Sequence, residues 1–546
     1  MTILKVNSTS LLIFLSFIFS IYFLGIINIP VLDRDEARFA SASKNMIESK
    51  DYIDIKLDGE TRYKKPIGIY WAQFVSTKIL GNYPYDEIWT YRIPSFLGIF
   101  ISLILIFFSI RKLVSEKVGF LSAFFLSLSF LTVTEINQAK SDGLLFLFIN
   151  ICNLIILKFA HDYEQNKYRE KQRKIVLIFW ISLALGILTK GPIILLFVFL
   201  PMFMFSLIKK DYFLFKAINF LPGYLIFLII SIPWFVLITV KSGGIFWQES
   251  VINDLLRKVP KGQESHGFYP GYYSLLLFIF LWPSCTFIIP TLKNLLYDRK
   301  RVTKNTKKLF LCCWFFAPFV IYELIATKLP HYVFPSYTPL VILISSFLMK
   351  KINSKEKLFS ISSYVCSLIF PLVILSIYVS AVYIYSELNF VTYLFIAILI
   401  LIILFLVQSL LKEKISNFFL FSALFQCFLY CVIIYDLKPH LKTFWISDNI
   451  NQIIEDEIEN IDNIYSYGFN EPSLVFLAGH KLKKIEPKIM LERALHSKRN
   501  LFILTEDNIE DFVNLNNKDI GMRRIKSFSG FNYSQGKNIN FFVYKN

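Results

Sequence analysis

A dense group of charged and aromatic residues follows directly on the first apolar run of the chain. It begins with the run DRDEAR at 33–38 and continues with RYKKP at 62–66 and the pair Tyr70-Trp71. Cations bind phosphate groups, and a carboxylate beside them can act as a general base or stabilise a positive charge. Because these residues lie next to a membrane span, they indicate a site that handles a phosphorylated lipid.

Two short helices are expected to lie along the membrane surface within this stretch, at about 35–49 and about 65–80. In the first, Asp35 and Arg38 are spaced i and i+3, so they share one face. In the second, Lys65 precedes Pro66 at the expected helix start, where backbone amides and cations both favour phosphate. The alternative is an interfacial helix whose charges are merely solvated, but several separate features here agree on a site.

Other outer loops carry further candidate residues. Asp142 lies at the outer mouth of a span, and Lys190 lies in an outer turn where it either neutralises a phosphate or pairs with an acid. The short turn at 327–332 brings Lys328, His331 and Tyr332 to the same membrane face as the first loop, and the loop at 241–270 carries His266. The alternative for Lys328 and Tyr332 is that they only anchor the protein at the membrane interface. The alternative for Asp142 is an acid without a function, because a carboxylate at the end of a membrane helix costs little free energy near the interface. The alternative for His266 is a hydrogen-bonded surface residue.

The composition is that of a polytopic membrane protein. The chain has 546 residues, 55% of them hydrophobic, and it contains many runs of the length that a bilayer span requires. Its net charge of +18 comes from basic loops between apolar runs, which argues against nucleic acid as a partner. The seven cysteines lie in apolar segments, and there is no phosphate-binding loop, dinucleotide fingerprint or HExxH motif.

The basic loops set the orientation. A window of about 20 residues predicts about 13 spans, at 9–29, 93–110, 118–134, 142–160, 175–189, 191–208, 218–240, 271–292, 309–327, 333–349, 358–381, 388–410 and 417–436. With this count the basic loops all fall on one side, which is then cytoplasmic: 111–112, 167–174, 209–210, 293–308, 350–357 and 412–414. The first run lacks a small-residue cleavage site and is predicted to be retained as a helix.

Two domains are expected. Residues 1–436 form the transmembrane part, with its outer-face helices within 30–92. Residues 437–546 form a small α/β domain outside the cytoplasm, because short alternating runs at 463–467, 501–504 and 541–544 predict strands and 450–461 predicts an amphipathic helix.

At these residues the chain resembles the polytopic GT-C glycosyltransferases that use lipid-phosphate sugars. The closest resemblance is to the bacterial enzymes that transfer aminoarabinose from undecaprenyl phosphate to lipid A, together with the related protein mannosyltransferases. It is carried by the runs DEARFA at 35–40, YKKP at 63–66 with Tyr70-Trp71, and KLPHY at 328–332, and also by LTKGP at 188–192 and Ser141-Asp142.

The resemblance implies roles for these residues. Asp35 and Asp142 are expected to be the catalytic carboxylates of one cavity, with Asp35 near the transferred sugar. The donor phosphate is expected on Arg38, Lys65, Tyr332 and Lys190, and the acceptor side of the cavity on Tyr63, Lys328 and His331. His266 matches a histidine that the aminoarabinose enzymes use near a divalent metal. Those enzymes place a glutamate before the Lys-Pro pair, where this chain has Lys64, and this departure counts against a metal site.

The expected function is therefore sugar transfer from a polyprenyl-phosphate donor to a lipid or glycolipid acceptor, with lipid A or lipopolysaccharide preferred. The enzyme is expected in the bacterial cytoplasmic (inner) membrane, with its active site on the periplasmic side. Two alternatives stay open: a protein O-glycosyltransferase, and a transporter or flippase of lipid-linked sugars. A transporter would place charges at mid-membrane and show inverted repeats, whereas the charges here lie in the outer loops.

Overall fold

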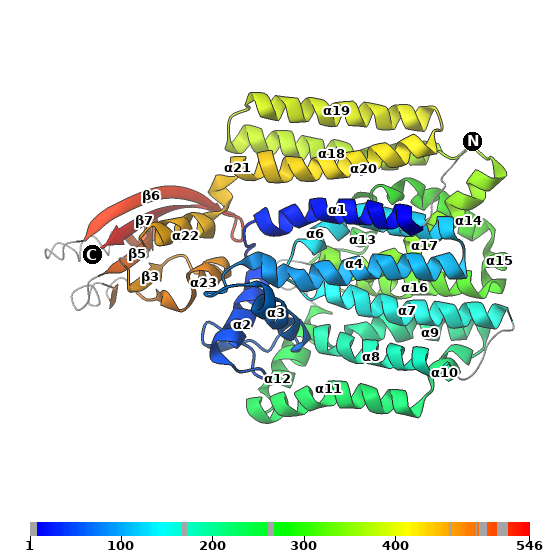
Figure 1. The fold of residues 1–546 in the computed structure, drawn as a ribbon, viewed down its shortest axis with the longest axis horizontal. Helices are drawn as coiled ribbons and strands as arrows, with labels where there is room; N and C mark the ends of the chain where they lie inside the picture. The colour runs from blue at the N-terminus through cyan, green and yellow to red at the C-terminus, as the bar shows by residue number, and fades with distance from the viewer. Residues whose placement is uncertain are drawn as a thin grey trace.

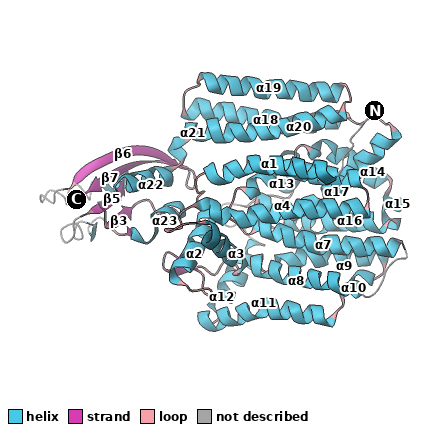
Figure 2. Cartoon of the chain, in the orientation of Figure 1, coloured by secondary structure: helices cyan, strands magenta, loops and turns pink. Residues whose placement is uncertain are grey.

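The computed structural model is a bundle of long helices with a small mixed sheet at one end (Figure 1). It describes residues 8–165, 172–259, 262, 267–457, 461–486, 489–490, 499–509 and 522–546. Figure 2 shows that the strands, apart from one short hairpin in the first outer loop, belong to the C-terminal part of the chain. This arrangement confirms the predicted fold class of a polytopic helical protein with a C-terminal α/β unit.

Within the described residues, eight helices are long and apolar enough to cross a membrane. They begin with α1 and end with α20. The buried apolar side chains of all but α11 form one continuous core, whereas Trp234 and Ile238 of α11 belong to a smaller cluster with residues of α2 and α3. Their bounds are α1 Ser8–Asn28, α4 Ile88–Leu113, α7 Asp142–Glu164, α11 Leu221–Ser242, α17 Phe334–Ser354, α18 Ile361–Tyr385, α19 Phe390–Leu411 and α20 Ile415–Val432.

Two pairs of consecutive helices are each long and apolar enough together to cross a membrane, but each pair is broken by a sharp bend. The first pair, α5 (Glu116–Leu128) and α6 (Phe130–Ile136), is bent by 63° at Ser129, whose hydroxyl accepts a hydrogen bond from the Thr132 amide and so caps α6. The second pair, α13 (Tyr272–Phe280) and the segment Ser284–Tyr297 that contains α14 (Ile288–Tyr297), is bent by 117°. With these pairs the described residues give up to 10 spans.

Three other predicted spans form helices that lie beside the rest of the bundle but are less apolar or shorter. They are α8 (Arg173–Lys190), α9 (Ile193–Lys209) and α16 (Thr306–Leu324). Charged residues at the ends of α8 and α16, and the 17-residue length of α9, keep them below the usual requirement for a span. The total of about 13 spans therefore stays a prediction.

The outer loop after α1 forms the two expected surface helices, at the end of the bundle that faces the sheet (Figure 1). The first, α2 (Asp35–Ser49), confirms the predicted range. The second, α3 (Gly68–Leu80), begins at Gly68 rather than at residue 65, because Lys65 and Pro66 belong to the turn before it. A short hairpin, β1 (Lys56–Leu57) with β2 (Glu60–Thr61), connects the two helices.

Short elements complete the membrane part. At the sheet end of the bundle lie α12 (Ile245–Trp247), the π-helical segment Gln248–Leu255, the single turns Leu256–Lys258 and Pro330–Val333, and α21 (Lys438–His440). Near the opposite end lie α10 (Phe213–Ile218) and α15 (Arg299–Lys304).

The C-terminal sheet has the strand order β4-β3-β5-β7-β6. Its central strands β3 and β5 are parallel, and β7 is antiparallel to both β5 and β6. The strands expected at 463–467, 501–504 and 541–544 are confirmed as β3, β5 and β7. The helix expected at 450–461 is α22, which begins four residues earlier, and residues 458–460 of that prediction lie outside the described residues. The bounds are α22 Ile446–Glu457, β3 Asn463–Tyr467, α23 Pro472–Ala478, β4 Leu482–Lys484, β5 Asn500–Thr505, β6 Arg523–Asn532 and β7 Lys537–Lys545.

Candidate active site

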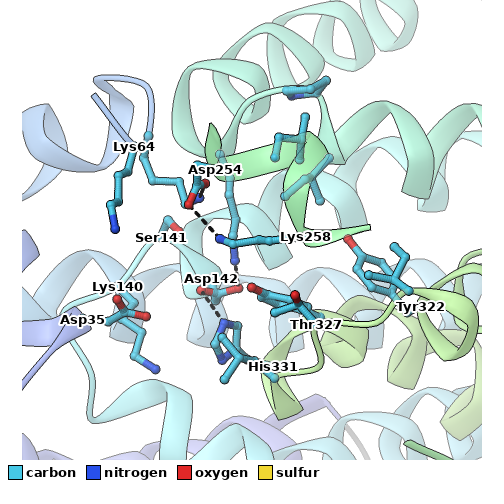
Figure 3. Close-up of a pocket in the computed structure, with 18 of the residues that line it drawn as sticks. Asp35, Lys64, Lys140, Ser141, Asp142, Asp254, Lys258, Tyr322, Thr327 and His331 are labelled. Atoms are coloured by element: carbon cyan, nitrogen blue, oxygen red, sulfur yellow. Dashed lines mark hydrogen bonds and ion pairs between the residues drawn. The ribbon is translucent and has the colours of Figure 1, made fainter. Parts of the chain in front are cut away.

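A cavity of about 270 Å³ opens at the end of the bundle that faces the C-terminal sheet. Figure 3 shows side chains from several distant segments pointing into it. Its polar lining residues come from α2, the turn before α3, the start of α7, the end of α8, the π-helical segment with the turn after it, the end of α16 and the turns before α17. They are Asp35, Arg38, Arg62, Lys64, Lys65, Lys140, Ser141, Asp142, Lys190, Asp254, Lys258, Tyr322, Thr327, His331 and Tyr332. Cations clearly outnumber carboxylates in this lining.

Helix α2 contributes Asp35 and Arg38, which both line the cavity as their i, i+3 spacing predicts. Among the described residues, the Asp35 carboxylate forms no ion pair. Burial alone would raise its pKa, but the surrounding positive charge, led by Lys140, holds the pKa below the ordinary value. Asp35 is therefore an ionised carboxylate that faces the cavity without a direct partner.

A second group of charges lies across the cavity from α2. Asp254 forms ion pairs with Lys65 and with Lys258, and the Lys258 Nζ–Asp254 Oδ1 distance is 2.8 Å (Figure 3). Burial lowers the pKa of Lys65 to about 8, even though Asp254 opposes that shift. The two lysines share one carboxylate, so this group carries an excess positive charge that an anion can neutralise.

The deep part of the cavity holds a buried ion pair. Lys190, at the end of α8, places its Nζ 2.5 Å from Oδ1 of Asp142, the first residue of α7. His331 Nε2 lies 3.9 Å from the other carboxylate oxygen, and Lys190 Nζ lies 5.5 Å from the centre of the Tyr332 ring. The sequence left two roles open for Lys190, neutralising a phosphate or pairing with an acid. In the structure Lys190 pairs with an acid, Asp142.

A second buried ion pair fixes the elements that carry these residues. Arg92 on α4 contacts Glu36 on α2 at two points of 2.8 Å each, and both side chains are almost inaccessible, with 0% and 1% exposure. Arg92 also donates to the carbonyls of Ile26, Ile29 and Pro30 at the end of α1. Glu36 accepts from the Ala139 amide at 2.8 Å, just before Asp142. This network ties α1, α2, α4 and the turn before α7 together.

Two expected cavity residues point elsewhere, which corrects the expectation that they line the cavity. Tyr63 is buried and donates to Asp54 Oδ1 at 2.8 Å. Lys328 is 1% exposed and donates to the carbonyls of Tyr322, Glu323 and Ile325, where it neutralises the C-terminal end of α16. Both are polar groups satisfied inside the protein, as buried polar groups normally are.

The structure also adds residues that were not singled out. Asp254, Lys258, Lys140 and Arg62 line the cavity. Three of them carried a signal in the sequence: Arg62 belongs to the run RYKKP, and Asp254 and Lys258 are spaced i, i+4 with opposite charge, as a helical ion pair requires. The approach of Asp254 and Lys258 to Lys65 depends on contact between segments far apart in the chain.

The described residues do not fit a divalent metal. No group of three or more His, Cys, Asp or Glu side chains comes together among them in the way that metal ligands would. Lys64, a cation, lines the cavity beside Lys65, and His266, the expected metal ligand, lies outside the described residues. We therefore assign no step to a metal.

Comparison with known sequences finds similarity to membrane sugar transferases. The family model for dolichyl-phosphate-mannose-protein mannosyltransferases matches residues 64–237. Over 331 residues the chain is 26% identical to undecaprenyl phosphate-alpha-4-amino-4-deoxy-L-arabinose arabinosyl transferase 2 of Pseudomonas fluorescens, covering 59% of this chain and 53% of the relative. The corresponding transferase of Wigglesworthia glossinidia brevipalpis is 26% identical over 340 residues, covering 61% and 58%. The match thus spans just over half the length of these relatives.

The fold is shared over nearly the whole chain with a solved structure. The crystal structure of ArnT from Cupriavidus metallidurans bound to undecaprenyl phosphate superimposes with a TM-score of 0.72, covering 98% of each chain at 16% identity. The apo structure of the same protein gives a TM-score of 0.73. The chain therefore shares its fold with this solved protein over nearly its whole length, and its sequence resembles the aminoarabinose transferases.

Proposed function

We propose that the protein is an integral membrane glycosyltransferase that moves a sugar from a polyprenyl-phosphate donor to lipid A or another lipopolysaccharide acceptor. The observation that carries the proposal is an unpaired, ionised Asp35 facing a cavity rich in cations. The names of the sequence relatives supply the donor class and the fold match agrees with it. A cavity of this charge suits a lipid phosphate, because cations stabilise the charge on a phosphate leaving group.

The chemistry follows from the positions of the charges. The bond between the anomeric carbon and the donor phosphate oxygen breaks, and its electron pair leaves with the phosphate. An oxygen of the acceptor forms the new bond to the anomeric carbon. Arg38 and Lys65, with Lys258 beside Lys65, stabilise the charge that develops on the departing phosphate.

Asp35 has one of two roles, depending on the acceptor. If the acceptor group is a hydroxyl, Asp35 takes its proton as general base. If the acceptor group is a phosphate, it is already ionised, and Asp35 stabilises the positive charge that develops on the sugar ring. The lowered pKa of Asp35 keeps the carboxylate ionised at neutral pH in both cases.

The deep residues complete the proposed site. Asp142 holds Lys190 in place, and Tyr332 and His331 lie beside that pair, so these residues shape the end of the cavity near the phosphate. The site is proposed to face the periplasm from the cytoplasmic membrane. The support is that the loops carrying the site residues all lie on the side opposite the basic loops.

Reconstituted protein tests the proposal. Purified protein in liposomes receives undecaprenyl phosphate-alpha-4-amino-4-deoxy-L-arabinose as donor and lipid A as acceptor, and mass spectrometry follows the product. We expect transfer by the wild type, a loss of at least about 100-fold with Asp35→Asn, and no change with Glu60→Gln, which is exposed in the same loop. The assay is repeated with core oligosaccharide and with peptide as acceptors. If the wild type transfers the sugar to none of these three acceptors, the proposal is wrong.

A further inference from the structure

The C-terminal domain contacts the turn that immediately precedes Asp35. Tyr533, at the tip of the β6–β7 hairpin, accepts a hydrogen bond from the Asp33 amide at 2.7 Å. The Ser473 amide, at the start of α23, donates to Asp33 Oδ1 at 3.2 Å. The Arg34 guanidinium donates to the carbonyl of Ser534. Both residues of the turn are therefore held by a domain that lies about 440 to 500 positions later in the chain.

The backbone of this turn is in a conformation that an arginine rarely adopts. Arg34 has φ 67° and ψ −109°, a region open to glycine but unfavourable for a residue with a Cβ atom. Such a conformation persists only where surrounding contacts impose it. Since Arg34 is the N-cap of α2, relaxation of its backbone would redirect Asp35, the first residue of that helix.

The tip of the β6–β7 hairpin is itself held in place by hydrogen bonds. Asn532 is 2% exposed and donates to Glu471 Oε1 at 2.9 Å, which joins the hairpin to the segment before α23. The Ser534 amide donates back to Asn532 Oδ1 at 3.0 Å. Tyr533 therefore projects from a turn that is itself fixed by internal hydrogen bonds.

A second contact holds the middle of the same helix. Lys44 is 4% exposed and donates to the carbonyl of Phe476 on α23 at 2.9 Å. Figure 1 shows α23 against α2 on the side of the sheet, while α4 lies on the side of the bundle. The Glu36–Arg92 pair fixes α2 to α4. Helix α2 is thus held from both sides, by the bundle and by the C-terminal domain.

We propose that the C-terminal domain is a positioning part of the active site: Tyr533 and Ser473 hold the Asp33–Arg34 turn in its strained form, and this directs the Asp35 carboxylate into the cavity. The inference rests on the proposed function. It assigns a catalytic consequence to a domain of which no described residue lines the cavity. Tyr533 is a positioning residue, since it touches the turn and not the reacting groups.

A set of conservative variants in the full-length protein tests this. Tyr533→Phe removes only the hydroxyl that accepts from Asp33. We expect kcat for the transfer assay described above to fall about tenfold, the change that corresponds to about 1.4 kcal/mol. KM for the donor should change less than kcat, because Lys65 and Lys258 bind the phosphate from elements outside α2 and only Arg38 does so from α2, one turn beyond Asp35. The matched control is Tyr467→Phe, in the same domain on β3.

The strained backbone supplies a rescue that a general loss of folding would not show. Glycine adopts the Arg34 conformation without strain. Arg34→Gly added to Tyr533→Phe should therefore recover most of the lost kcat. Arg34→Ala should not, since alanine loses the same side chain but keeps a Cβ atom.

The outcomes separate the two claims. If the wild type is active and the Tyr533→Phe variant has the same kcat, the positioning role of Tyr533 is overturned and the proposed function stands. Equal recovery by Arg34→Gly and Arg34→Ala would also overturn it. Absence of transfer in the wild type would instead overturn the proposed function, and the positioning role with it.

Discussion

Asp142 and Lys190, which are 48 residues apart in the chain, meet at 2.5 Å inside the cavity. Both side chains are nearly inaccessible, with 7% and 6% exposure. The ammonium of Lys190 is therefore neutralised by protein before any anion enters. An entering phosphate would share this lysine with Asp142, whereas it would meet Lys65 and Lys258 as a pair with excess positive charge.

The Asp142–Lys190 pair should be strongly coupled in stability. Asp142→Asn leaves the buried ammonium of Lys190 without its partner, and such a loss typically costs about 3–5 kcal/mol. The double variant Asp142→Asn with Lys190→Met should recover part of this cost, because no unpaired charge remains. Unfolding in detergent is measured for Asp142→Asn, for Lys190→Met and for the double variant. Additivity of the single effects to within about 0.5 kcal/mol would show that the pair is not coupled.

The Glu36–Arg92 pair should matter more for stability than an exposed pair of the same type. Glu36→Gln leaves a fully buried guanidinium without its carboxylate, so we expect a loss of about 3–5 kcal/mol. Glu116→Gln is the matched control. Its partner Arg111 lies 3.5 Å away and both side chains are largely exposed, so a change of about 0–1 kcal/mol is expected. Similar losses for the two variants would contradict the framework role of Glu36.

Binding of a lipid phosphate should weaken as the pH passes about 8, the value to which burial lowers the pKa of Lys65. Below this pH Lys65 is charged and attracts phosphate; above it the lysine loses its proton and that attraction. A phosphate monoester has its second pKa near 6, so its own charge is constant in this range. Binding of undecaprenyl phosphate between about pH 7 and 9.5 measures the effect.

Arginine at position 65 provides the comparison for this pH dependence. Its guanidinium stays charged throughout the range, so Lys65→Arg should bind with little change between about pH 7 and 9.5. Lys78→Arg, on the exposed side of α3, should keep the wild-type profile. An unchanged profile for Lys65→Arg would assign the titration to another group.

Much of the framework follows from local sequence patterns. The range of α2 and the shared face of Asp35 and Arg38 follow from helical spacing, and β3, β5 and β7 follow from alternating apolar runs. These features depend on residues close together in the chain. The start of α3 was placed too early, because Pro66 is compatible both with the first helical turn and with the turn before it.

The rest depends on contacts that no local pattern contains. The approach of Asp254 to Lys65 joins residues 189 positions apart, and nothing in either segment specifies it. The position of Lys328 in a short turn between two helices predicts that it lines the cavity. In the structure its ammonium instead donates to the carbonyls at the end of α16. The hold of Tyr533 on the turn before Asp35 depends on the docking of a separate domain.

Mass spectrometry of lipid A and lipopolysaccharide tests the central claim most directly, in cells that carry the intact gene, a deletion, or Asp35→Asn. We predict that a sugar-sized mass present with the intact gene is missing both from the deletion and from Asp35→Asn. Loss in the deletion but not in Asp35→Asn would contradict the role of Asp35, and unchanged lipids in both strains would contradict the assignment to lipid A and lipopolysaccharide.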